Sequence, residues 1–146
     1  TINVGLIGFG TVGSGLAEVL LSQQERLVQR SGLSVQLTKV ADINITELPS
    51  KFAATTLTGD AADLINDPDI DIVVELIGGI QPAKKFVLDA IAAGKHVVTA
   101  NKALLSQEGK EIFSAAAARG VEVGFEASVG GGIPVIKSLK EGLVAN

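Results

Sequence analysis

Short apolar runs alternate with longer segments of helical spacing along most of the chain. The apolar runs predict strands, which lie at residues 2–7, 34–41, 71–76, 96–99 and 121–125, with a less regular one around 54–57. Apolar residues repeated every three or four positions predict helices, which lie at residues 11–30, 60–66, 82–94 and 103–119 and from Pro134 to the chain end. This alternation predicts an α/β protein of the Rossmann type, a doubly wound parallel sheet with helices on both faces and strand order 3-2-1-4-5-6.

Composition and charge narrow the class of protein. The chain has 146 residues, the size of one domain, and 47% of them are hydrophobic, which suffices for a sizeable core. The net charge of −4 argues against nucleic acid or a membrane surface as a partner. With no cysteine and one histidine, disulfide frameworks, thiol catalysis and transition-metal sites have almost no residues to use. We therefore expect residues 1–146 to form a single soluble, cytoplasmic domain.

A glycine-rich turn stands between the first predicted strand and the first predicted helix. It has the G-x-G-x-x-G spacing of dinucleotide-binding proteins and consists of Gly8, Phe9, Gly10, Thr11, Val12 and Gly13. The first glycine permits a tight turn, the second lets the backbone approach a pyrophosphate, and the third lets the helix pack close to the strand. A purely structural turn is the alternative, but the strand–turn–helix context favours dinucleotide binding.

Asp42 follows the second predicted strand, at the sheet edge where ligands of doubly wound sheets bind. A carboxylate there can accept hydrogen bonds from both hydroxyls of the adenosine ribose and would repel a 2′-phosphate, which favours NAD over NADP. Lys39 and Lys51 are still near enough in sequence to reach such a phosphate. The alternative for Asp42 is a solvated acid at the end of a strand, in an Asx turn with Ile43 and Asn44.

Two further segments follow strands on the same edge. Glu75 is expected to hydrogen-bond loop amides rather than act as an acid. The next residues, Ile77, Gly78 and Gly79, are expected to bind the cofactor, the glycines letting the nicotinamide-side ribose approach the backbone.

The segment at the end of the fifth predicted strand is also assigned to the cofactor site. It consists of Thr99, Ala100, Asn101 and Lys102. Lys102 opens a helix, where a cation is disfavoured, so its ammonium needs an anionic or polar partner. A solvated lysine is the alternative. His96 begins the same strand, about 10 Å from the edge at roughly 3.3 Å per residue, and is expected to be structural.

Residues 126–134 follow the sixth predicted strand and contain three successive glycines before a proline. This pattern is compatible with an anion-binding nest, with a bend whose carbonyls join Glu126 around a hard cation, and with an ordinary glycine-rich hinge. The residues alone leave all three open.

Four segments together resemble the N-terminal cofactor domain of homoserine dehydrogenases, and they are residues 5–13, 74–79, 99–105 and 126–134. The resemblance implies reversible oxidation of L-homoserine to L-aspartate 4-semialdehyde with NAD or NADP, in threonine and methionine biosynthesis. It implies that residues 9–13 hold the pyrophosphate and that residues 99–102 lie beside the nicotinamide. Lys102 resembles one of two catalytic lysines that bracket the substrate hydroxyl. A sodium site is implied at Glu126 and the carbonyls of Val129, Gly131 and Ile133.

Two departures limit what the resemblance implies. Many members carry an arginine just before the acid that ends the second strand, where it can pair with a 2′-phosphate, whereas Ala41 stands there in this chain and favours NAD. The second lysine and the acidic substrate ligands belong to a following substrate and dimerisation domain, which residues 1–146 do not reach. We therefore expect the dinucleotide-binding domain of a longer, homo-oligomeric enzyme, inactive by itself on its amino-acid substrate. A non-catalytic redox-sensing module and another small-substrate dehydrogenase are the alternatives.

Overall fold

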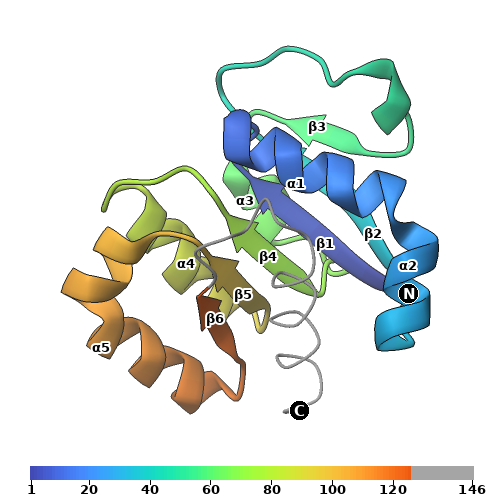
Figure 1. Cartoon of the computed structure of the whole chain (residues 1–146). Helices are drawn as coiled ribbons and strands as arrows, with labels where there is room; N and C mark the ends of the chain where they lie inside the picture. The colour runs from blue at the N-terminus through green and yellow to red at the C-terminus, as the bar shows by residue number, and fades with distance from the viewer. Residues whose placement is uncertain (126–146) are drawn as a thin grey trace.

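Six parallel strands form one sheet in the computed structural model, which describes residues 1–125. The strands are β1 (Ile2–Ile7), β2 (Val35–Ala41), β3 (Thr56–Thr58), β4 (Ile72–Glu75), β5 (His96–Thr99) and β6 (Val123–Phe125). They lie in the order β3-β2-β1-β4-β5-β6 across the sheet (Figure 1), so the strand order predicted from the sequence is confirmed.

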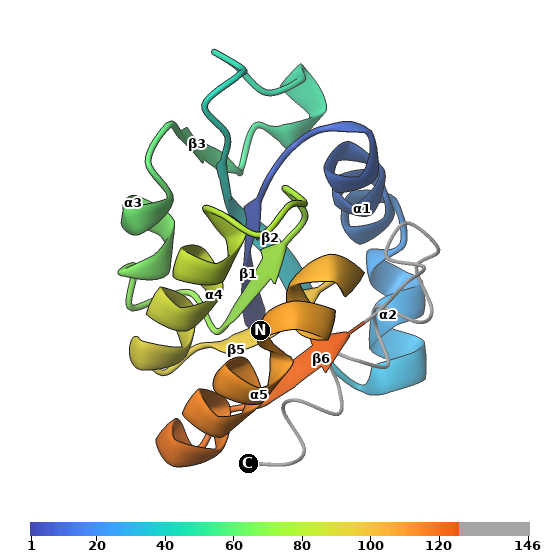
Figure 2. The same ribbon diagram turned by 90° about the vertical axis from the view of Figure 1, so that its left-hand side faces the viewer.

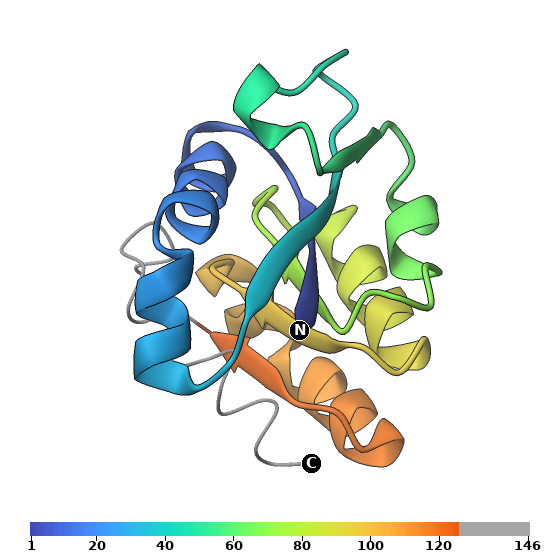
Figure 3. The same cartoon turned by 90° about the vertical axis from the view of Figure 1, so that its right-hand side faces the viewer.

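Helices cover both faces of this sheet. They are α1 (Thr11–Ser22), α2 (Gln24–Ser31), α3 (Ala61–Ile65), α4 (Ala83–Ala92) and α5 (Lys102–Arg119), with a short 3₁₀ helix, η1 (Ser50–Phe52). Figures 2 and 3 show α1 and α2 on one side of the sheet and α3, α4 and α5 on the other. The doubly wound α/β fold is thus confirmed. Within residues 1–125, no helix combines the length and the apolar character needed to cross a bilayer.

Each layer of helices shares its own apolar core with the sheet. The fully buried members of the first core include Leu16, Leu20, Leu27, Val4 and Val74. Those of the second core include Leu64, Val87, Ile112, Val73 and Val97. Burial of one such side chain contributes roughly 1.5–3 kcal/mol to folding before conformational entropy is counted. The two cores therefore hold the strands firmly, and the loops at the sheet edge start from fixed positions.

The helix predicted at residues 11–30 bends at Gln23 into α1 and α2. Gln23 leaves the helical region with φ −117° and ψ 29°. The backbone hydrogen bonds on both sides persist, from the Gln23 N–H to the Val19 carbonyl (3.0 Å) and from the Leu27 N–H to the Gln23 carbonyl (2.9 Å). Because Leu27 stays buried in the same core as the α1 leucines, the apolar stripe continues through the bend. The prediction of one continuous helix was therefore wrong. The sequence does not reveal the bend, because the apolar stripe is uninterrupted and no glycine or proline stands at Gln23.

Three other helix ends carry residue types that commonly cap helices. Asp60 caps α3 by accepting a hydrogen bond from the Ala62 N–H (2.9 Å). Gly32 and Gly120 end α2 and α5 in the left-handed conformation that favours glycine.

The carboxyl ends of all six strands are aligned, and Thr58 at the end of β3 pairs in register with Ala41 of β2. Ile7 at the end of β1 pairs in register with Ala41 of β2 and Glu75 of β4. Glu75 in turn pairs with Thr99 of β5, and Thr99 with Phe125 of β6. The loops that follow β1, β2, β4 and β5 therefore begin at one level of one edge, which is where doubly wound sheets bind ligands.

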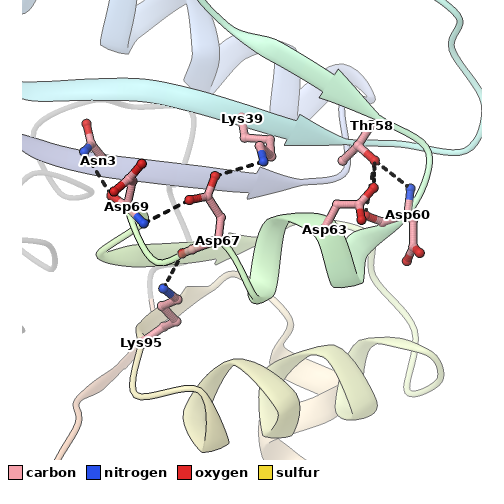
Figure 4. A network of polar contacts seen from close by, with 8 residues as sticks. All are labelled: Asn3, Lys39, Thr58, Asp60, Asp63, Asp67, Asp69 and Lys95. Carbon is pink, nitrogen blue, oxygen red and sulfur yellow. Dashed lines mark hydrogen bonds and ion pairs between the residues drawn. The ribbon is translucent and has the colours of Figure 1, made fainter.

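A polar network ties the turn between α3 and β4 to the neighbouring strands (Figure 4). One carboxylate oxygen of Asp67 pairs with the Lys39 ammonium of β2 at 2.9 Å, and the other accepts the Asp69 N–H at 2.9 Å. Lys95, buried just before β5, donates to the Asp67 carbonyl at 2.6 Å. The hydrogen bond from Lys39, followed by that from the Asp69 N–H, holds the pKa of Asp67 below its usual range.

We expect Asp67→Asn to lower the free energy of unfolding at pH 7 by about 1 kcal/mol, the upper value for partly exposed ion pairs. Because the folded pKa of Asp67 lies below the unfolded value, its contribution is present above the unfolded pKa and is lost as the pH falls through the folded pKa. The difference between wild type and variant should therefore shrink below about pH 4. Urea denaturation at a series of pH values measures this.

Asp69→Asn is the matched control, since it removes a carboxylate from the same turn while Lys39 stays paired. This control should follow the wild type at every pH. A stability difference for Asp67→Asn that stays constant down to the lowest pH would contradict the assignment.

Candidate functional site

The glycine-rich turn joins β1 to α1 with almost no free space at its two ends. Gly8 has φ +102°, a conformation that favours glycine. A Cβ on Gly13 would lie 2.0 Å from the Gly8 carbonyl oxygen, far closer than a side chain permits. A Cβ on Gly10, by contrast, would meet nothing within 4 Å. The fold therefore requires the first and third glycines, and the second faces open space.

α1 starts beside this open space without a side-chain cap. Gly10 occupies the N-cap position, and the first turn contains no acidic residue. The N–H groups in the first turn of a helix have no partner within the helix and carry partial positive charge. Thr11 and Val12 are exposed at this end. The start of α1 is thus suited to an anion.

Asp42 connects the glycine-rich turn to the loop after β2. One of its carboxylate oxygens accepts the Phe9 N–H at 2.7 Å, and the other accepts the Asn44 N–H at 2.7 Å. The second bond is the Asx turn that the sequence left as an alternative. The side chain is half-buried and a carboxylate has about four acceptor positions, so it retains capacity for further donors.

The two lysines near Asp42 in sequence are engaged elsewhere. Lys39 forms the ion pair with Asp67, and Lys51 is paired with Glu18 of α1. Each ammonium therefore already has a carboxylate partner and is not free to pair with a 2′-phosphate beside Asp42.

A cleft of about 450 Å³ opens next to Asp42 at the same edge. It is mainly apolar, and its lining residues include Ile7, Ala41, Ile43, Ala61, Ile77, Pro82 and Phe86. Ile43 is 84% exposed although it is a large aliphatic residue. Sequence reasoning missed most of this cleft; an isoleucine directly after the acid that ends a strand was the available signal.

Glu75 is buried with 1% of its surface exposed, and its carboxylate serves the loop after β4. One oxygen accepts the N–H groups of Ile77 (2.9 Å) and Gly78 (3.2 Å), as expected from the sequence. The other accepts the Thr99 hydroxyl at 2.7 Å. Gly78 and Gly79 are both left-handed, with φ +77° and +71°, and both are exposed.

The residues from the end of β5 to the start of α5 differ in their exposure to solvent. Thr99 is completely buried, and its hydroxyl also accepts the Asn101 N–H at 2.9 Å. Asn101 caps α5 by accepting the Leu104 N–H at 3.0 Å, and its amide donates to the Gly79 carbonyl at 2.5 Å. Ala100 is half-buried. Lys102 is the first residue of α5 and is exposed, and no carboxylate within residues 1–125 forms an ion pair with its ammonium.

His96 lies at the start of β5, away from the edge that carries these loops. Its Nδ1 accepts the Glu122 N–H at 3.1 Å, which joins β5 to the segment before β6. Burial lowers the pKa of its imidazole, so the neutral form is favoured. This contact agrees with the structural role expected from the sequence.

The predicted sodium ligands Glu126, Val129, Gly131 and Ile133 lie outside the described residues, as does the predicted last helix.

The arrangement of loops at one sheet edge can be compared with known proteins. The profile of a family described as homoserine dehydrogenase, NAD binding domain, matches residues 8–126. The chain belongs to this family. The resemblance noted from the sequence is thereby confirmed.

Individual homoserine dehydrogenases are similar to the chain over nearly its whole length. The enzyme of Pseudomonas aeruginosa is 48% identical over 99% of the chain, which covers 33% of that protein. The crystal structure of a homoserine dehydrogenase from Thiobacillus denitrificans has a TM-score of 0.81 and 51% identity, over 99% of this chain and 34% of that one. The S. aureus enzyme at pH 7.5 has a TM-score of 0.79 and 32% identity, over 87% of this chain and 32% of that one. The chain thus spans about a third of the length of these homoserine dehydrogenases.

We expect Gly13→Ala to lower the free energy of unfolding by about 2 kcal/mol or more, since the new methyl group would press on the Gly8 carbonyl of the main chain. Dinucleotide binding should be lost with it, because the start of α1 must move away. Gly15→Ala is the matched control in the same helix, where a Cβ meets nothing within 4 Å. It should stabilise the chain by about 0.5–1 kcal/mol through helix propensity. Equal effects of the two substitutions in thermal and urea denaturation would contradict this account.

Proposed function

We propose that this chain is the cofactor-binding domain of a longer homoserine dehydrogenase, which oxidises L-homoserine to L-aspartate 4-semialdehyde with a nicotinamide dinucleotide. The observation that carries the proposal is the uncapped start of α1 beside Gly10, linked through the Phe9 N–H to Asp42, in a chain that belongs to this family. The residues fit a dinucleotide, because open space, free first-turn N–H groups and a strand-end carboxylate occur together.

In this proposal the pyrophosphate lies against residues 10–13, where the first turn of α1 offers its N–H groups. The adenosine ribose lies at Asp42, which keeps acceptor capacity beyond the Phe9 and Asn44 bonds. The mainly apolar cleft beyond it suits an adenine ring, with Ile43 and Phe86 as walls. The nicotinamide-side ribose lies at the exposed Gly78 and Gly79, whose missing side chains allow close approach.

NAD is the preferred cofactor in this proposal. Asp42 places a negative charge where a 2′-phosphate would lie, and Ala41 supplies no cation in front of it. The ion pairs of Lys39 with Asp67 and of Lys51 with Glu18 reduce the positive charge available to such a phosphate.

Lys102 is assigned the proton chemistry of the substrate hydroxyl. A nicotinamide dinucleotide held beside Gly78 and Gly79 would supply the acceptor for the hydride on the carbon that bears this hydroxyl. The hydroxyl must lose its proton, and the oxygen needs a cation or a base beside it. Lys102 is exposed at the edge that carries Gly78, Gly79 and Asn101, so its ammonium is free to meet a substrate. The sodium site around Glu126 stays a prediction from the sequence.

We expect the chain to bind NADH more tightly than NADPH, by roughly tenfold or more for one repelled charge at close range. It should not oxidise homoserine, because the second lysine and the acidic substrate ligands of the family lie beyond it. Fluorescence titration with both cofactors and an assay with homoserine measure this. Tighter NADPH binding would overturn the cofactor preference. Failure to bind either cofactor at millimolar concentration, or turnover by the chain alone, would overturn the proposal.

We expect Lys102→Ala in the full-length enzyme to lower kcat by roughly 10²-fold or more, the range of a proton-transfer group. Cofactor affinity should change much less, since the lysine acts on the substrate. Lys110→Ala removes another exposed lysine of α5 and should leave kcat and NADH binding unchanged. Steady-state kinetics beside direct NADH titration separates the effects. A near-normal kcat with weakened NADH binding would show that Lys102 positions the cofactor instead.

A further inference from the structure

A chain of hydrogen bonds, part-buried at the loop after β4 and buried beyond it, connects this loop to the start of α5. It runs from the Ile77 and Gly78 amides to the Glu75 carboxylate, then through the Thr99 hydroxyl to the Asn101 N–H. Within the proposed function, its two ends carry the groups that must meet: the glycines assigned to the nicotinamide side of the cofactor, and Lys102, which directly follows Asn101.

The buried carboxylate is a costly group to place here. Glu75 is 1% exposed, and no lysine or arginine within residues 1–125 forms an ion pair with it. Hydrogen bonds from its neighbours must therefore satisfy this carboxylate, and an apolar residue at position 75 would leave the Ile77 and Gly78 amides and the Thr99 hydroxyl without their acceptor. The specific property of the carboxylate is that it accepts from two loop amides and a hydroxyl at once.

The Asn101 N–H also fixes the Thr99 hydroxyl. Because this N–H can only donate, the hydroxyl oxygen accepts it at 2.9 Å, and the hydroxyl hydrogen is directed to the Glu75 carboxyl oxygen at 2.7 Å. A glutamine at position 75 would offer one carbonyl oxygen and an NH₂ group, so it cannot accept all three donors.

Asn101 makes a second, independent link between the same two segments. Its Oδ1 accepts the Leu104 N–H and so fixes the first turn of α5, while its Nδ2 donates to the Gly79 carbonyl. The side chain is 7% exposed, so neither bond competes much with water. Two links of different chemistry thus hold the Gly78–Gly79 loop against the first turn of α5.

We propose that Glu75, Thr99 and Asn101 are positioning residues that set the Gly78–Gly79 loop relative to Lys102. Their role is to hold the cofactor side and the proton-handling side of the site at a fixed distance and orientation. The proposal rests on the proposed function, since it needs Lys102 and the glycine loop to act on one reaction. A misplacement of about 1 Å between reacting groups can lower a rate by roughly 10²-fold.

Thr99→Val in the full-length enzyme tests this link, because valine keeps the shape and removes the hydroxyl. We expect kcat to fall by roughly 10- to 100-fold with a much smaller change in the Kd of NADH, since the proposed contacts of the pyrophosphate with residues 10–13 and of the adenosine ribose with Asp42 do not involve this link. Thr99→Ser keeps the hydroxyl and should restore most of kcat. Val97→Ala is the matched control, a buried cavity in the same strand. Val97→Ala should lower the melting temperature by about as much as Thr99→Val does, but it should leave kcat unchanged.

Asn101→Asp tests the second link and serves also if Thr99→Val does not fold. Aspartate keeps the cap of α5 but places a carboxylate oxygen, in place of the amide donor, against the Gly79 carbonyl, so kcat should again fall, and Val97→Ala controls for the accompanying loss of stability. Loss of kcat in both variants, with rescue by Thr99→Ser, supports the proposal. A normal kcat in a folded Thr99→Val or Asn101→Asp enzyme, or an equal loss in Val97→Ala, overturns it. A wild-type enzyme that binds NADH but never oxidises homoserine overturns the proposed function, and this proposal with it.

Discussion

The close approach of α1 to the end of β1 is the contact on which the rest of the site depends. The Gly8 carbonyl oxygen occupies the place where a Cβ of residue 13 would be, so the axis of α1 is fixed relative to the sheet. This fixes in turn where the first-turn N–H groups lie. It also directs the Phe9 N–H to Asp42 and the Phe9 ring to Phe52, which it meets edge-on with the ring centroids 5.9 Å apart. One backbone contact therefore sets β1, β2 and η1 relative to the N-terminal end of α1.

The sequence predicts those features that depend on local patterns. Apolar runs indicate the buried parallel strands, and glycine spacing indicates the turn, because both follow from a few neighbouring residues. The cleft beside Asp42 could not be predicted in the same way, since Ile43 follows β2, whereas Pro82 and Phe86 belong to the start of α4, about forty residues further along the chain. The burial of the Thr99 side chain could not be predicted from the sequence either. A threonine at the end of a strand has the same local pattern whether its hydroxyl meets a ligand or the carboxylate of the next strand.

Asp42 and Glu75 show that carboxylate groups at one sheet edge can have two different roles. Asp42 directly follows β2 and Glu75 is the last residue of β4, and both accept backbone N–H groups, so their sequence contexts look alike. Asp42 is half-buried and keeps acceptor capacity toward solvent. Glu75 is enclosed, and its acceptors face protein donors from two loops. Exposure, which depends on the tertiary fold, distinguishes a carboxylate that can receive a ligand from one that organises the loops around it.

The two backbone hydrogen bonds of Asp42 bear on any attempt to redesign the coenzyme specificity of such a domain. The usual change replaces the acid with a neutral or basic residue to admit a 2′-phosphate. Here that change would release the Phe9 amide and the Asx turn at Asn44 together, so the glycine-rich turn would lose its tie to β2. A redesign that keeps an acceptor at position 42 and introduces the cation at the 84% exposed Ile43 would separate charge recognition from loop architecture.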